Sequence, residues 1–268
     1  SEHNLELPPG SQPYKPGDVV EAGAFRVEPF RVNHSIADAV GLAIHTPVGT
    51  IVHSGDFKFD YTPVDGQVAD FHRLAELGRQ GVEVLICDST NADRPGYTPS
   101  EKTVGQALDE IIARAPGRVL VATFASNVHR IQQAVTAARA HGRKVAVVGR
   151  SIENTVQVAL ELGYLHIPDG TLIEAEEIRR LPAERLLILT TGTQGEPMSA
   201  LARMASGEHR LVEIIPGDTV VIAATPVPGN ESMVYRVVNN LFRLGARVIH
   251  GREDGVHVSG HGAQEEIK

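Results

Sequence analysis

The pattern of hydrophobic and polar positions divides the chain into two parts of different character. The stretch up to about Gly23 is rich in Pro and Gly and is predicted to be loop. Short strand-like segments follow, with one segment of helical spacing that stops at Gly81, and Pro29 indicates an edge or a bulge. The predicted strands are residues 24–32, 41–46, 50–54 and 84–87, the predicted helix is 68–80, and the Pro-Val-Gly turn indicates a hairpin. The first part is therefore predicted to be rich in β-structure, with 84–87 as a short buried strand.

Helices and strands alternate from about residue 92 to the end of the second part. Thr98-Pro99-Ser100-Glu101 has the pattern of a capping box with Pro at the first helical position. The predicted strands are residues 118–123, 144–148, 186–190, 219–224 and 247–250, and the predicted helices are 98–115, 126–141, 152–162, 197–205 and 231–244. Strands separated by helices favour right-handed βαβ units and a mainly parallel, doubly wound sheet. The fold class is therefore α/β.

Composition and charge restrict the class of protein further. Hydrophobic residues make up 42% of the 268 positions, enough for a substantial core. The single cysteine, Cys87, cannot form an internal disulfide, so a reducing cytoplasm is the expected location. No apolar run approaches the ~20 residues of a membrane helix, so no membrane partner is expected. The net charge of −8 argues against a nucleic-acid partner unless other features outweigh it.

Several candidate metal-binding or catalytic residues follow predicted strands in the first part. His34 comes just after a strand and Asp56 just after the hairpin, and an imidazole with a carboxylate suits zinc or manganese. A satisfied loop histidine and a turn-capping aspartate explain the same residues. Asp88 follows the apolar run 84–87, where a carboxylate can belong to a site or cap an Asx turn.

Three further segments could bind phosphate. Ser126 and Asn127 open a predicted helix with Arg130 one turn along, and N-capping is the alternative explanation. The loop Gly192–Gly195 lacks the lysine and spacing of a Walker A motif but could approach a ligand. The tail His257-Val258-Ser259-Gly260-His261 is predicted as a loop in which two imidazoles, a hydroxyl and backbone amides suit phosphate binding or proton transfer.

Taken together, six motifs resemble the ribonuclease J enzymes, in the β-CASP branch of the metallo-β-lactamase superfamily. They are Val-Asn-His-Ser-Ile, His-Ser-Gly-Asp-Phe-Lys, Cys-Asp-Ser-Thr-Asn, Thr-Phe-Ala-Ser-Asn, Thr-Gly-Thr-Gln-Gly-Glu-Pro and His-Val-Ser-Gly-His, in family order. The resemblance implies a partial metallo-β-lactamase αββα domain in residues 1–92, an inserted Rossmann-like β-CASP domain in 93–252, and a return into the first domain in 253–268. It covers nearly the whole chain.

The resemblance also implies a function and a set of roles. Family enzymes hold two divalent metals, zinc or manganese, and hydrolyse RNA phosphodiesters as endonucleases and 5′-to-3′ exonucleases in RNA processing and decay. By motif match, His34 and Asp56 are metal ligands, with Asp56 bridging the metals. Asp88 orients the histidine of the next motif, which we expect to be His257, the candidate general acid. Ser259, Gly260 and His261 are expected to line a pocket for a 5′-monophosphate, with His257 and Val258 from the same motif and Ser126 and Asn127 as further RNA contacts.

The chain departs from the family pattern in two ways. Ala37 replaces a common proline, which is minor. The main metal motif His-x-His-x-Asp-His and the late Pro-Val-His-Gly-like motif are absent from the sequence, which leaves His34 and Asp56 as matched ligands. We therefore expect a fragment that binds catalytic metal weakly and cleaves RNA slowly or not at all, because two ligands do not normally hold a dinuclear site. For an intact enzyme, the resemblance implies a homodimer or tetramer and RNA-degradation partners.

Two alternatives remain open from the residues. The chain could be a catalytically silent RNA-binding or scaffolding module. It could also be a nucleotide-binding α/β protein that uses the loop Gly192–Gly195, away from His257.

Overall fold

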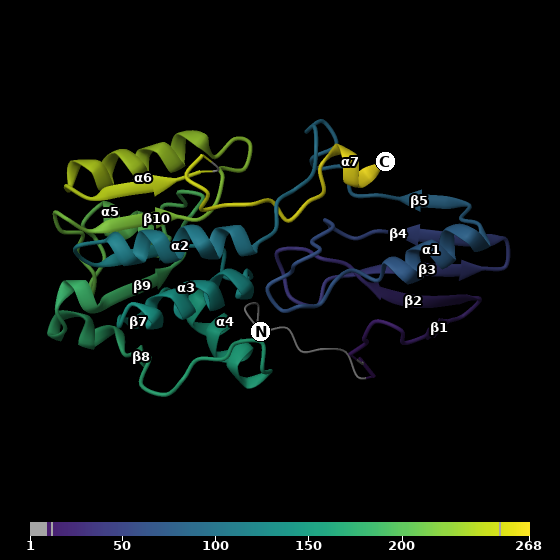
Figure 1. Cartoon of the computed structure of the whole chain (residues 1–268), viewed down its shortest axis with the longest axis horizontal. Coiled ribbons are helices and arrows are strands. Elements are labelled where there is room, and N and C mark those ends of the chain that lie inside the picture. Colours follow the sequence, from purple (N-terminus) through teal and green to yellow (C-terminus); the bar gives the residue numbers. More distant parts are fainter. Residues whose placement is uncertain (1–9, 12, 252) are drawn as a thin grey trace. The chain divides into compact units, whose positions relative to one another are not determined.

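The computed structural model describes residues 10–11, 13–251 and 253–268, and its chain forms two compact units. Unit 1 comprises Ser1–Ser100 with Ser259–Lys268, and unit 2 comprises Glu101–Val258 (Figure 1). The predicted domain boundaries, after residues 92 and 252, remain a prediction beside these divisions after Ser100 and Val258. Among the described residues, no helix combines the length and the apolar character needed to cross a bilayer.

Unit 1 is built on a five-stranded sheet with the order β1-β2-β3-β4-β5. Its strands are β1 (Val20–Ala22), β2 (Phe25–Arg31), β3 (Val40–Thr46), β4 (Gly49–His53) and β5 (Val84–Ile86), and its helices are α1 (Phe71–Gln80) and α7 (Gln264–Ile267). Neighbours from β1 to β4 are antiparallel, whereas β5 runs parallel to β4. A small core that includes Phe30, Val52 and Leu77 joins this sheet to α1.

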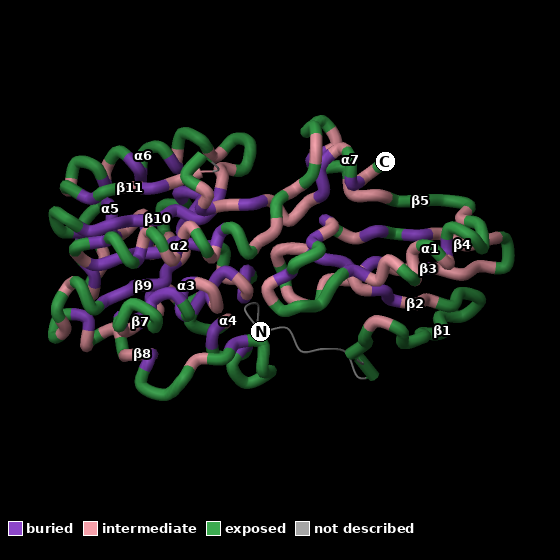
Figure 2. Tube along the Cα trace, in the orientation of Figure 1, coloured by how far each residue is buried: buried purple, intermediate pink, exposed green. Residues whose placement is uncertain are grey.

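The hairpin predicted around Pro47-Val48-Gly49 is present as β3 and β4. Two other expectations for unit 1 were wrong in part. Strand β1 lies in the stretch predicted as loop, because pairing with β2 rather than an apolar pattern defines this exposed strand. Residues 84–86 form the expected strand, but their exposed fractions are 49%, 61% and 49% (Figure 2). Strand β5 lies at the edge of the sheet and has one strand neighbour, β4, among the described residues. An apolar run predicts burial only where other elements also cover both faces of the strand.

Unit 2 is built on a six-stranded sheet with the order β11-β10-β6-β9-β7-β8, in which every neighbouring pair is parallel. Its strands are β6 (Val119–Ala122), β7 (Lys144–Val148), β8 (Leu172–Ile173), β9 (Leu186–Thr190), β10 (Thr219–Ile222) and β11 (Arg247–His250). Its helices are α2 (Lys102–Arg114), α3 (Val128–Ala140), α4 (Arg150–Glu161), α5 (Ala200–Ala205) and α6 (Glu231–Arg243), with 3₁₀ turns η1 (Ala175–Arg180) and η2 (Ala183–Arg185). The predicted α/β class with a parallel sheet is confirmed.

The side chains of the central strands alternate between two apolar layers. Val119 and Val121 of β6 pack with α2, α3 and α4, whereas Leu120 and Ala122 pack with α5 and α6. Strands buried on both faces need continuous apolar sequence, which explains the uninterrupted run Leu186–Leu189 in β9. Figure 2 shows β9 as buried along its length.

The capping box predicted at the start of α2 does not form. Helix α2 begins at Lys102 with Glu101 as its N-cap residue, and Glu101 makes no side-chain capping hydrogen bond. The carboxylate of Glu101 binds the guanidinium of Arg130 on α3 instead, at 2.8 Å for each of two N···O distances. A buried arginine thus uses the carboxylate that local sequence assigns to the cap.

Candidate metal centre

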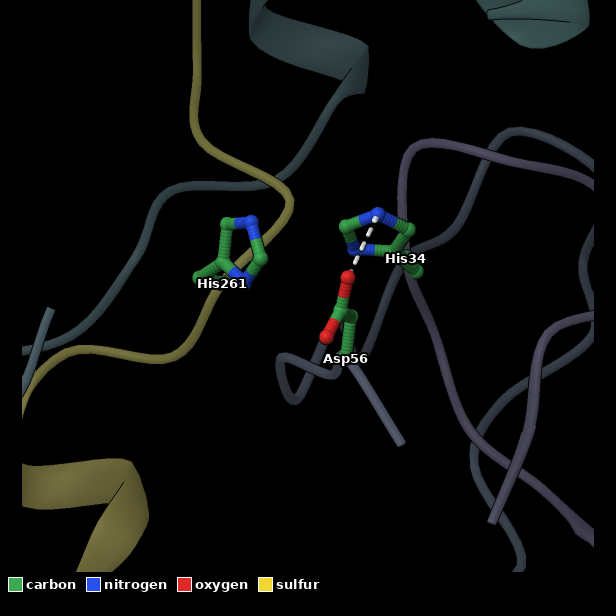
Figure 3. A group of neighbouring side chains, drawn as sticks. All are labelled: His34, Asp56 and His261. Carbon is green, nitrogen blue, oxygen red and sulfur yellow. Dashed lines mark ion pairs between the residues drawn. The ribbon is translucent and has the colours of Figure 1, made fainter. Parts of the chain in front are cut away.

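Three side chains of unit 1 converge from segments far apart in the sequence. His34 follows β2, Asp56 follows β4, and His261 lies in the return segment, by which we mean residues 259–268. One ligand atom from each of the three lies within 4.8 Å of the others, and Figure 3 shows the side chains turned toward a shared space. Nε2 of His34 is 3.9 Å from Oδ2 of Asp56. The two predicted metal ligands are therefore neighbours, and a second imidazole joins them.

Buried polar contacts set the positions of the His34 and Asp56 loops. The backbone carbonyl of Asn33 accepts a hydrogen bond from the amide of Lys58 at 2.8 Å. The side chain of Asn33 donates to the carbonyl of Gln67 and accepts from the amide of Ala69. One buried asparagine therefore ties the segment that precedes His34 to the segment that follows Asp56.

Glycines permit two close approaches at this cluster. Gly55 has a φ of +62°, and a Cβ there would lie 2.7 Å from the carbonyl oxygen of Val40. A Cβ on Gly260 would lie 2.6 Å from Nδ1 of His34. Only glycine therefore fits at position 55, in the turn before Asp56, and at position 260, where the backbone passes close to His34.

The imidazole of His34 has a defined orientation and a lowered pKa. Nδ1 lies 2.9 Å from the carbonyl oxygen of Gly260, and because a carbonyl only accepts, Nδ1 is the donor. Nε2 is then the lone-pair nitrogen that faces Asp56, with the hydroxyl of Ser35 at 3.2 Å. Burial lowers the pKa of His34, and this effect outweighs the opposing effect of the hydrogen bond to Gly260. The neutral form is the one that binds a metal.

The imidazole of His261 is oriented by a carboxylate. Nδ1 of His261 lies 2.7 Å from Oδ2 of Asp88, and the His261 ring meets the His34 ring edge-on at a centroid distance of 4.9 Å. Burial raises the pKa of Asp88, but hydrogen bonds from the Thr90 amide, from His261 and from the Phe57 amide outweigh burial and lower it overall. Asp88 is therefore ionised near neutral pH, and His261 donates from Nδ1.

This pairing corrects one sequence-based expectation, in which Asp88 orients His257. The return segment is bound to the rest of unit 1 by Asn91, which donates to the hydroxyl of Ser259 and the carbonyl of His261. The carboxylate of Glu266 also accepts from the amides of Phe59, Thr98 and Ala263. These long-range contacts bring His261 to Asp88, and two histidines four positions apart cannot be distinguished from local sequence.

The donor set fits a divalent metal. Imidazole nitrogen and carboxylate oxygen are ligands of zinc and manganese. Each imidazole donates from Nδ1 to an oxygen, of Gly260 or of Asp88, as metal-binding histidines do with their second nitrogen. The side chain of Asp56 is 66% exposed, so the carboxylate is accessible.

The remaining predicted residues belong to both units. Ser259 and Gly260 lie in unit 1, where the Ser259 hydroxyl also accepts from the amide of His261 at 3.1 Å. His257, Val258, Ser126 and Asn127 belong to unit 2. Asn127 is buried, and its side chain caps α3 by accepting from the amide of Arg130. Their roles in binding RNA remain a prediction.

Sequence reasoning missed the anchoring residues of this centre. Asn91 stands in the same Cys-Asp-Ser-Thr-Asn motif as Asp88, so the motif itself could have indicated it. Asn33 stands beside His34 in the first motif. Local sequence does not indicate the anchoring role of Glu266, because two of its three amide donors, Phe59 and Thr98, come from distant segments.

The loop Gly192–Gly195 has an internal explanation that weakens the nucleotide-binding alternative. A Cβ on Gly195 would lie 2.5 Å from the backbone of Met233, and one on Gly192 would lie 2.3 Å from the Ser199 hydroxyl. Gln194 donates to the carbonyl of Thr225 and accepts from the amide of Val227. The glycines and Gln194 thus serve packing within unit 2.

Comparison with known proteins identifies relatives over nearly the whole chain. The family model "Ribonuclease J, beta-CASP domain" matches residues 116–241. Ribonuclease J of Thermus thermophilus is 52% identical over 254 residues, covering 94% of this chain and 44% of that protein. Ribonuclease J of Synechocystis is 49% identical over 258 residues, covering 96% of this chain and 40% of that protein. Ribonuclease J of Helicobacter pylori is 49% identical over 249 residues, covering 93% and 36%.

The chain spans less than half the length of these curated relatives. A crystal structure of a protein of unknown function from Enterococcus faecalis shares the fold, with a TM-score of 0.64 and 16% identity over 94% of this chain and 56% of that one. The match of residues 116–241 lies inside unit 2, and the relatives extend the similarity across the segments that carry His34 and Asp56. The chain is therefore similar to the ribonuclease J proteins over more than nine tenths of its length.

Proposed function

We propose that this chain carries part of the active site of an RNA-degrading metallohydrolase. The observation that supports the proposal is the cluster of His34, Asp56 and His261, whose ligand atoms lie within 4.8 Å of one another. The name ribonuclease J, printed for relatives about half identical to this chain, supports RNA as the substrate. Endonuclease and 5′-to-3′ exonuclease activities, and two metal ions per site, belong to this proposal for the longer protein.

His34 and Asp56 are the proposed metal ligands, through Nε2 and a carboxylate oxygen. Zinc or manganese bound there would supply a Lewis acid that polarises the phosphoryl group of an RNA phosphodiester. His34 is suited to the task because burial keeps its imidazole neutral and Gly260 holds Nδ1. Asp56 is suited because its exposed carboxylate adjoins Nε2 of His34.

His261 is the proposed proton donor, in place of His257. The ionised Asp88 accepts from Nδ1 of His261 and fixes the orientation of the ring, so that Nε2 is the atom that would transfer a proton to a leaving oxygen. Nε2 belongs to the same ring that meets His34 edge-on, so the proton would be delivered beside the metal ligands. His257, Val258, Ser259, Gly260, Ser126 and Asn127 remain proposed contacts to RNA, including a 5′-monophosphate end.

Metal titration of the 268-residue chain tests the ligand assignment without any need for activity. Isothermal titration with Mn²⁺ and with Zn²⁺ is expected to show weak binding that His34→Gln and Asp56→Asn abolish. His261→Gln is expected to retain most of the metal affinity, and His72→Gln on the exposed face of α1 is the control. Unchanged metal binding in His34→Gln and Asp56→Asn would contradict the ligand assignment, and a loss in His261→Gln as large as theirs would make His261 a ligand.

The substrate class is tested by binding of single-stranded oligonucleotides to the same chain. We expect RNA with a 5′-monophosphate to bind more tightly than the same RNA with a 5′-hydroxyl, and RNA to bind more tightly than DNA of equal sequence. Equal affinity for all three would contradict RNA recognition. Cleavage of RNA in Mn²⁺ is expected to be slower than cleavage by Thermus thermophilus ribonuclease J, and equal rates would contradict the weak metal binding proposed for this chain.

A further inference from the structure

Arg130 is a fully buried arginine whose donors are all used inside unit 2. It is 1% exposed and lies on α3. Its guanidinium donates twice to Glu101, once to the carbonyl of Ala223, once to the carbonyl of Val258 and once to Nδ1 of His257. An arginine has five N–H donors, so none remains for phosphate. The sequence placed Arg130 beside a candidate phosphate site, and the structure places it in the protein interior instead.

The partners of Arg130 mark the two points where the chain crosses between units. Glu101 is the first residue of unit 2, and Val258 is the last. Ala223 directly follows β10 at the carboxyl edge of the parallel sheet. One guanidinium therefore joins the incoming segment, the outgoing segment and the sheet edge.

The contact with His257 determines which ring nitrogen carries the proton. Nη1 of Arg130 lies 3.3 Å from Nδ1 of His257. A guanidinium can donate but cannot accept, so Nδ1 of His257 must be the acceptor in this contact. The proton of the neutral ring is then on Nε2, which makes Nε2 a hydrogen-bond donor.

We propose that Arg130 is a positioning residue for RNA binding, which holds His257 in the Nε2–H tautomer so that this N–H donates to an RNA phosphate oxygen. The RNA contact of His257 rests on the proposed function, whereas the tautomer rests on the geometry of unit 2 alone. Arg130 acts through His257 and touches no substrate itself.

Unit 2 contains a matched control for this arginine. Arg118 is also buried and binds Asp218 through two hydrogen bonds of 2.9 and 2.6 Å, and it donates to the carbonyl of Glu213. Arg118 directly precedes β6 and Asp218 directly precedes β10, so this pair lies at the amino edge of the sheet. Loss of either arginine removes a buried pair, but only Arg130 contacts His257.

The tautomer is measured by nitrogen NMR of the imidazole rings in the histidine-labelled 268-residue chain, in mildly alkaline buffer. The His257 signals are assigned by their absence from His257→Gln. We expect Nε2–H in the wild type and in Arg118→Lys, and a shift toward Nδ1–H in Arg130→Lys, because one ammonium cannot replace all five donors. Glu101→Gln retains the guanidinium and is expected to retain the Nε2–H tautomer, which gives a second variant if Arg130→Lys does not fold. An Nδ1–H ring in the wild type, or no shift in Arg130→Lys, would overturn the proposal.

The consequence for RNA is measured by the affinity for a single-stranded 5′-monophosphate RNA. We expect Arg130→Lys and His257→Gln each to weaken binding roughly tenfold, the loss of one hydrogen bond to a charged group. The double variant is expected to be no weaker than either single variant, because both remove the same contact. Additive losses, or an equal loss in Arg118→Lys, would overturn the positioning role. An unchanged affinity in His257→Gln with a shifted tautomer in Arg130→Lys would overturn only the RNA contact assigned under the proposed function.

Discussion

The carboxylate of Asp88 has an unusual concentration of donors for one small side chain. It accepts from His261 and from the amides of Thr90 and Phe57, and its side chain is 4% exposed. Each hydrogen bond to an ionised group contributes more than a neutral one, because the charge must otherwise be desolvated without compensation. Asp88 therefore connects the stability of unit 1 to the orientation of the His261 ring.

Asp88→Asn is expected to destabilise the chain by about 1–3 kcal/mol at neutral pH. The pKa of Asp88 is lowered in the folded state, so its contribution is complete above the ordinary value of 3.8 and is lost as pH falls through the folded pKa. The variant should thus also show a smaller loss of stability on acidification in urea unfolding. Asp109→Asn removes a carboxylate that pairs with His141 on the surface of unit 2 and should have little effect. Equal effects of the two variants would contradict the role of Asp88.

Two partly buried histidines predict a second pH dependence. Burial lowers the pKa of His34 and of His209 from the ordinary value of 6.5. In this pH range the unfolded chain binds protons that the folded chain does not bind. The free energy of unfolding should therefore fall as the pH drops below about 6.5, and level off below the folded pKa values. Nδ1 of His209 accepts from the amides of Leu211 and Val212, contacts that protonation would break.

His209→Gln should reduce the slope of unfolding free energy against pH in this window. His72→Gln, which removes a histidine that is 89% exposed, is the surface control. A slope that is the same in the wild type and His209→Gln would show that His209 does not contribute.

At the scale of elements, the loop between β9 and α5 is shaped by its contact with α6. Gly195 has a φ of +73°, and a Cβ there would lie 2.5 to 2.6 Å from backbone atoms of Met233 and Val234 at the start of α6. Backbone cannot move aside as a flexible side chain can, so this glycine sets the distance between the loop and the helix. The loop and α6 should therefore form as one packed element.

Gly195→Ala and Gly207→Ala separate this contact from backbone strain. Gly207 has a φ of +75°, and no atom lies within 4 Å of the position that a Cβ would take there, so it carries the strain without the clash. Gly207→Ala should cost about 1 kcal/mol, and Gly195→Ala should cost more, about 3 kcal/mol or above. Urea unfolding measures both, and equal losses would contradict the steric argument.

At the scale of the whole molecule, the two units differ in how their sheets are covered. The unit 2 sheet has apolar layers on both faces and is formed by one continuous stretch, Glu101–Val258. Unit 1 is discontinuous in sequence, has the smaller core and leaves β5 exposed. Burial of apolar surface is the main stabilising term. Unit 2 has the larger apolar core and is therefore the unit expected to fold on its own.

Residues 101–258 produced alone should fold cooperatively. Circular dichroism and urea unfolding should show a single transition, and amide exchange should be slowest in β6, β9 and β10. A stretch of equal length that begins at residue 60 would cut through both units and is the negative control. A non-cooperative transition for 101–258 would show that unit 2 needs the rest of the chain.

Local sequence was sufficient for most elements of unit 2 because its helices and strands bury apolar faces with clear periodicity. The strands predicted at residues 144–148 and 186–190 match β7 and β9. Prediction from local sequence failed where contact with a distant segment decides the structure. Pairing with β2 creates β1, lack of cover exposes β5, and Arg130 takes the carboxylate of Glu101 from the predicted cap. At the candidate site, the sequence indicated Asp56 and His34, because strand ends with such residues are chemically distinctive.

The sequence by itself determined the α/β class, the order of most elements of unit 2 and the residue types available for chemistry. The reason is that periodicity and motif composition are local properties of the chain. Only the tertiary structure decided which of two nearby histidines meets Asp88, since that contact joins residues separated by 173 positions. Only the tertiary structure also decided that Arg130 serves His257 rather than phosphate, because five donors find partners from separate segments once α3 packs on the sheet.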